Sequence, residues 1–162
     1  MFWQFDLTKD SSNLPYFEPK LVSEGLLKAG AVALLCALKH PPALIMIEEI
    51  ENGVNIENVA EFLGWIRQTI GKDKRTKFIL TTHSPSVIRQ FSGDLDAVYN
   101  VHLRSKDHRS LLTNLNDALS VYVRMGTVEG DFEEKEGKEI VKVKPYKLTE
   151  LFYGGILKKI GL

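Results

Sequence analysis

What this sequence lacks excludes several classes of protein. Its 162 residues include one cysteine, Cys36, so the disulfide framework of a small extracellular protein cannot form within the chain. Basic and acidic residues both number 21, so the net charge does not indicate a polyanionic partner. No run of about 18 apolar residues could cross a bilayer, and the first 13 residues do not form a signal peptide. We therefore expect a cytoplasmic protein with no membrane partner.

One motif is also missing. The sequence Gly-x-x-x-x-Gly-Lys-Ser/Thr, whose loop wraps the α- and β-phosphates of a nucleotide, occurs nowhere in the chain. The chain is long enough, and with 44% hydrophobic residues apolar enough, to form one compact core.

The spacing of apolar residues predicts alternating helices and strands, with Ser23 as an N-cap and the run at 43–47 as a strand buried on both faces. This order is typical of an α/β fold in which crossover helices join the strands of a parallel sheet. The expected elements are helix 23–39, strand 43–47, helix 55–71 capped by Asn55, strand 78–82, a short helix from Ser84 and Pro85, and strand 97–103.

The remainder of the chain predicts a helix over 114–125, a charged and exposed hairpin over 128–144, and a last helix capped by Thr149. Pro15 and Pro19 favour an extended arm at the beginning. The expected domains are an arm at 1–22, a central domain at 23–125, and a hairpin with a C-terminal helix at 126–162.

Two adjacent carboxylates, Glu48 and Glu49, follow the strand at 43–47. Ligands of open α/β sheets bind at the carboxyl ends of the strands. Because two ionised carboxylates repel each other, a bound magnesium ion gives a reason to hold them side by side. Solvation of a strand end is the structural alternative.

Three segments together resemble the motifs of ABC-type ATPases of the SMC/RecF-like AAA family, which includes the OLD-like predicted ATPases. Segment 44–53, LIMIEEIENG, is similar to the Walker B strand and D-loop, with Glu48 and Ile50 in place of the family's aspartate and proline. Segment 22–28, VSEGLLK, resembles the signature sequence, and TTHSP at 81–85 resembles the switch-histidine segment. Their order and spacing match the family layout without gaps.

The resemblance implies a P-loop NTPase-like fold and a role for each motif residue. Glu48 would face Mg²⁺, Glu49 would orient or deprotonate the attacking water, and His83 would sense the γ-phosphate of ATP. The signature, which would meet a nucleotide bound by a partner, would consist of Ser23, Glu24 and Gly25. The D-loop would consist of Glu51, Asn52 and Gly53.

The chain then corresponds to the C-terminal half of such an ATPase, without the Walker A part. We expect it to hydrolyse ATP only when combined with a Walker A-bearing N-terminal half, as a fragment or a split subunit, and to be inactive alone. The resemblance also implies a homodimer partner. A nucleic acid or an effector protein is a further possible partner, by analogy with relatives in DNA repair or phage defence. The alternative is a non-catalytic interaction or regulatory module derived from such an ATPase.

Overall fold

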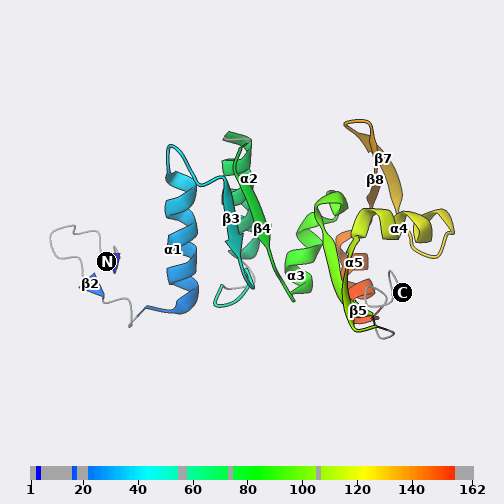
Figure 1. Cartoon of the computed structure of the whole chain (residues 1–162), viewed down its shortest axis with the longest axis horizontal. Helices are drawn as coiled ribbons and strands as arrows, with labels where there is room; N and C mark the ends of the chain where they lie inside the picture. The colour runs from blue at the N-terminus through cyan, green and yellow to red at the C-terminus, as the bar shows by residue number, and fades with distance from the viewer. Residues whose placement is uncertain are drawn as a thin grey trace. The chain divides into compact units, whose positions relative to one another are not determined.

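The computed structural model describes residues 3–4, 16–17, 22–54, 58–72, 75–104 and 107–155. They belong to two compact units, divided between Thr82 and His83, and Figure 1 shows the elements of each. Two short strands, β1 (Trp3–Gln4) and β2 (Tyr16–Phe17), pair antiparallel near the start of the first unit. Within the described residues, no helix is both long and apolar enough to span a membrane.

The main part of the first unit is two helices and a parallel pair of strands. The elements are α1 (Glu24–Ala37), β3 (Leu44–Ile47), α2 (Val59–Lys72) and β4 (Lys77–Leu80). Ser23 caps α1 as predicted, since its Oγ accepts a hydrogen bond from the amide of Leu26 at 3.3 Å. The predicted cap at Asn55 lies outside the described residues.

Strands β3 and β4 pair in parallel, with Leu44 opposite Lys77 and Ile47 opposite Leu80. The expectation that the strand at 43–47 is buried on both faces is wrong for the described structure. Ile45 and Ile47 are 6% and 8% exposed, whereas Leu44 and Met46 are 51% and 67% exposed. Alternate side chains of a strand point to opposite faces, so only one face of β3 contributes to the core.

The second unit is built around one apolar core. Its core residues are Leu95, Leu115, Leu119, Val128, Val141, Val143, Leu148 and Leu151. Its elements are α3 (Pro85–Ile88), 3₁₀ turns at Arg89–Phe91 and Leu95–Ala97, β5 (Tyr99–Arg104), β6 (Arg109–Asn114), α4 (Leu115–Arg124), β7 (Asp131–Lys135), β8 (Lys138–Lys142) and α5 (Pro145–Tyr153).

The strand predicted at 97–103 does not join a parallel sheet. It is β5, which pairs antiparallel with β6, a strand that the sequence patterns did not indicate. Only four residues connect the two strands, and a parallel connection needs a crossover of a dozen or more. The described residues therefore contain a parallel pair, not the expected three-stranded parallel sheet.

Two further predictions need correction in this unit. The last helix begins at Pro145, which suits the first helical turn, whereas Thr149 lies inside α5 and its Oγ1 donates to the oxygen of Pro145 at 3.3 Å. The predicted hairpin forms, but it is not exposed throughout. Ile140 and Val141 of β8 are 3% and 0% exposed.

Candidate functional site

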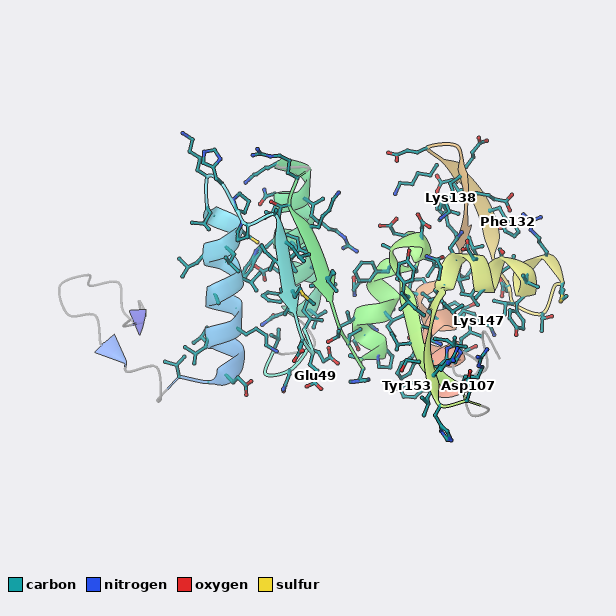
Figure 2. The ribbon with its side chains drawn as sticks, viewed as in Figure 1. Glu49, Asp107, Phe132, Lys138, Lys147 and Tyr153 are labelled. Carbon is teal, nitrogen blue, oxygen red and sulfur yellow. The ribbon has the colours of Figure 1, made fainter. Side chains whose placement is uncertain are left out.

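Glu48 and Glu49 lie just beyond the carboxyl end of β3, where Figure 2 labels Glu49. Both side chains are exposed. Thr81, which follows β4, fixes this end of the strand through three hydrogen bonds. Its amide donates to the oxygen of Ile47 at 3.0 Å, its oxygen accepts from the amide of Ile50 at 3.0 Å, and its Oγ1 accepts from the amide of Glu49 at 2.9 Å.

The backbone of Glu49 has a φ of +43°, in the left-handed region. A residue with a Cβ atom is uncommon there, and the conformation costs roughly 1–3 kcal/mol. Such strain persists only where surrounding contacts fix it, and it gathers at functional sites. The hydrogen bond from the amide of Glu49 to Thr81 is one of those contacts.

Lys28 of α1 provides a second contact. Its Nζ donates to the main-chain oxygen of Glu49 at 2.8 Å and to that of Glu48 at 3.3 Å. Sequence reasoning treated Lys28 only as a basic residue of the signature segment and missed this tie. Its position three residues after Gly25, hence on the same side of the helix, is the signal that could have indicated it.

The segments predicted to be the signature and the D-loop touch through their glycines. A Cβ atom added to Gly25 would lie 1.5 Å from the oxygen of Gly53, and one added to Gly53 would lie 2.5 Å from the nitrogen of Gly25. Gly53 also has a φ of +75°, which favours glycine. Gly25 is buried, whereas Ser23 and Glu24 beside it are exposed.

The turn after Glu49 is closed by its own polar groups. The amide of Asn52 donates to the oxygen of Glu49 at 2.8 Å, and its Nδ2 donates to the Glu49 carboxylate at 3.5 Å. The carboxylate of Glu51 accepts from the Oγ1 of Thr82 at 2.7 Å. All three residues predicted for the D-loop therefore take part in contacts of the first unit.

Ile50, which stands where the ABC-type ATPases that this segment resembles have proline, has a clear structural role. Its side chain is fully buried, and its amide donates to Thr81, a bond that proline cannot make.

His83 is the first residue of the second unit and directly follows Thr82. Its side chain is exposed. Ser84 caps α3 as predicted, since its Oγ accepts from the amide of Ser86 at 3.2 Å, and Pro85 occupies the first turn.

The carboxylates fit a magnesium ion that is carried mainly by a nucleotide. Across the described residues no three His, Cys, Asp or Glu side chains gather as a preformed metal site. Mg²⁺, however, is commonly held by one or two carboxylates together with substrate phosphates. The exposed Glu48, at the carboxyl end of β3, suits that arrangement.

A family model described as "AAA domain, putative AbiEii toxin, Type IV TA system" matches residues 7–89, just over half of the chain. The matched segment includes the residues predicted for the signature and the D-loop, both carboxylates and His83. No curated protein matches the sequence significantly.

Proposed function

Since the chain belongs to the AAA domain family, the class of ATPase-type nucleotide-binding domains, we propose that it supplies the hydrolytic part of a composite, dimeric ATPase of the ABC/SMC type. The observation that carries the proposal is the strained turn at Glu49. This turn lies at the carboxyl end of β3 and is tied to the signature helix α1 by Lys28.

In this proposal each exposed group has one task. Glu49 orients the attacking water and accepts its proton, because its carboxylate is exposed beyond the strand end. Ser23 contributes to a second nucleotide bound by a partner: its Oγ accepts from Leu26, so its own proton remains available for a phosphate oxygen. His83 contacts the γ-phosphate and reports whether ATP is intact.

Glu48 would hold Mg²⁺, mostly through water. The bound ion would neutralise the negative charge that develops on the phosphate oxygens during transfer. Glu48 has one methylene more than the family's aspartate, so its carboxylate can reach the same ion from a backbone slightly farther away.

A phosphate-binding segment outside these 162 residues, on the same polypeptide or another, completes the site. The outer face of the β3–β4 pair supports such a partner, because Leu44, Met46 and Ile79 are about half exposed or more there. Parallel sheets normally have both faces covered. Nucleotide bound between the Walker A-bearing half and the signature of a second copy then drives dimerisation.

The test combines the chain with a phosphate-loop-bearing half and measures phosphate release. We expect Glu49→Gln to lower turnover by about 10²- to 10⁴-fold, the usual contribution of a general base. Glu61→Gln, an exposed glutamate in the first turn of α2, is the matched control and should change turnover less than about twofold. Equal rates for the Glu49 variant and the native chain would show that Glu49 is not the base.

The departure at Glu48 favours a second candidate, a non-catalytic interaction or regulatory module that retains the scaffold of such an ATPase. Light scattering after gel filtration distinguishes the two. The module predicts the same molar mass with and without ATP in the presence of the phosphate-loop half. Dimerisation that appears only with ATP excludes the module.

A further inference from the structure

A second set of polar groups surrounds a cavity at the opposite end of β3 and β4. The cavity has a volume of about 400 Å³ and is lined by the last turns of α1 and α2 and by described residues of the segments that follow these helices. Figure 1 shows that both segments lead into the amino ends of the two strands. Since β3 is four residues long, the cavity is separated from Glu48 by about 13 Å of strand.

Four basic side chains line this cavity. Lys39 and His40 come from the segment after α1, and Lys72 and Arg75 come from the end of α2 and the segment after it. No described residue of the lining is acidic. For the part of the chain that the structure describes, Lys39 and Lys72 have no ion pair. Two cationic groups thus face the same space without a counter-charge among its described lining residues.

The remaining lining combines apolar and polar surface. Leu38 and Pro41 are apolar, and Cys36 is a small, partly buried group. Thr69 is 4% exposed, and its Oγ1 donates to the oxygen of Trp65 at 2.9 Å, so the hydroxyl oxygen keeps its capacity to accept a hydrogen bond. A volume of about 400 Å³ is within the usual range for small-molecule pockets.

We propose that this cavity binds a small phosphorylated ligand, whose phosphate groups contact Lys39 and Lys72 and whose apolar part lies against Leu38 and Pro41. The charge of the ligand follows from the site. Two lysines facing one space match an anion with at least two negative charges, and a phosphate offers several acceptor oxygens to an ammonium group. This site is separate from the proposed catalytic end, so it does not depend on the proposed function.

The test measures binding of inorganic pyrophosphate to the full chain by calorimetry at low salt. We expect Lys39→Gln and Lys72→Gln each to weaken binding about tenfold, and the double variant to abolish it, because each change removes one charge-assisted hydrogen bond. The matched control is Lys77→Gln. Lys77, the first residue of β4, is an exposed lysine two positions after Arg75 that does not line the cavity, and its variant should bind within about twofold of the native chain. Circular dichroism checks that every variant is folded.

A second arm uses a fluorescent single-stranded DNA of twelve nucleotides, which carries the same phosphate chemistry but is too large for the cavity. Binding of pyrophosphate that depends on Lys39 and Lys72 supports the proposal, with or without DNA binding. Binding of DNA without binding of pyrophosphate overturns it and makes this region a nucleic-acid contact. An equal loss of pyrophosphate binding in the Lys77 variant also overturns the proposal, because the loss would then come from the lower net positive charge of the protein and not from the cavity.

Discussion

The Nζ atom of Lys28 donates a 2.8 Å hydrogen bond to the main-chain oxygen of Glu49. A residue of the signature helix therefore holds the turn that carries the proposed general base. The same lysine also donates to the oxygen of Glu48, so one cation satisfies two successive carbonyls at the strand end.

Lys28→Met keeps most of the aliphatic stem but removes both hydrogen bonds. We expect the free energy of unfolding to fall by about 1 kcal/mol, since the donor is charged but only partly buried. Urea denaturation measures this change, and hydrogen exchange at Ile50 should become faster as the turn loosens. Lys77→Met on β4 is the control and should alter the free energy by less than about 0.5 kcal/mol. If both variants unfold at the same urea concentration, the Lys28 contact does not stabilise the turn.

Gly25→Ala tests the contact between the signature and D-loop segments. The added Cβ would lie 1.5 Å from the oxygen of Gly53, so a backbone segment must move, and we expect a loss of at least about 2 kcal/mol. Gly64→Ala in α2 is the matched control. Nothing lies within 4 Å of the added Cβ there, so the better helix propensity of alanine should stabilise the protein by about 0.5–1 kcal/mol. Thermal unfolding should show a lower melting temperature for Gly25→Ala and a higher one for Gly64→Ala. Melting temperatures that shift in the same direction would contradict the contact between Gly25 and Gly53.

Ile50→Pro would introduce the residue that the ABC-type ATPases resembled by this segment have at this position, yet we expect it to destabilise this chain. Proline loses the amide that bonds to Thr81 and most of a fully buried side chain, and it disfavours the helical backbone region for Glu49 before it. The expected cost is about 3 kcal/mol or more, against about 1 kcal/mol for Ile50→Val. Chemical denaturation distinguishes the two variants. A proline variant as stable as the valine variant would mean that the amide of Ile50 contributes little.

Asp107 in the β5–β6 hairpin should titrate below its ordinary value. The side chain of Arg104 hydrogen-bonds to its carboxylate, with the Nε atom at 2.8 Å from Oδ1, and this contact lowers the pKa of Asp107. A lowered folded-state pKa means that the contact stabilises the hairpin above pH 3.8, the ordinary value, and that this stabilisation is lost as the pH falls below it. NMR titration of the carboxyl carbon should show the pKa rising toward 3.8 in Arg104→Gln. Equal pKa values in the native chain and in Arg104→Gln would rule out this cause.

Local signals in the sequence determined much of the secondary structure. Ser23 and Ser84 were recognisable as caps because an N-cap depends on the few residues that follow it, and both accept the expected backbone hydrogen bond. Periodicity placed α4 correctly for the same reason, since an amphipathic face is a property of the helix itself. The order of the motif residues was likewise present in the sequence, and their chemical roles remain proposals.

The tertiary structure alone decided which surfaces meet. An apolar run such as 43–47 does not reveal whether one face or both are covered, because burial depends on elements elsewhere in the chain or beyond it. Segment 97–103 had the composition of a strand, but the sequence did not show that it would pair antiparallel with β6. The contact of Gly25 with Gly53 and the hydrogen bonds of Lys28 join residues that are twenty or more positions apart. Such contacts follow from the packing of α1 against the turn that follows β3, which no local pattern encodes.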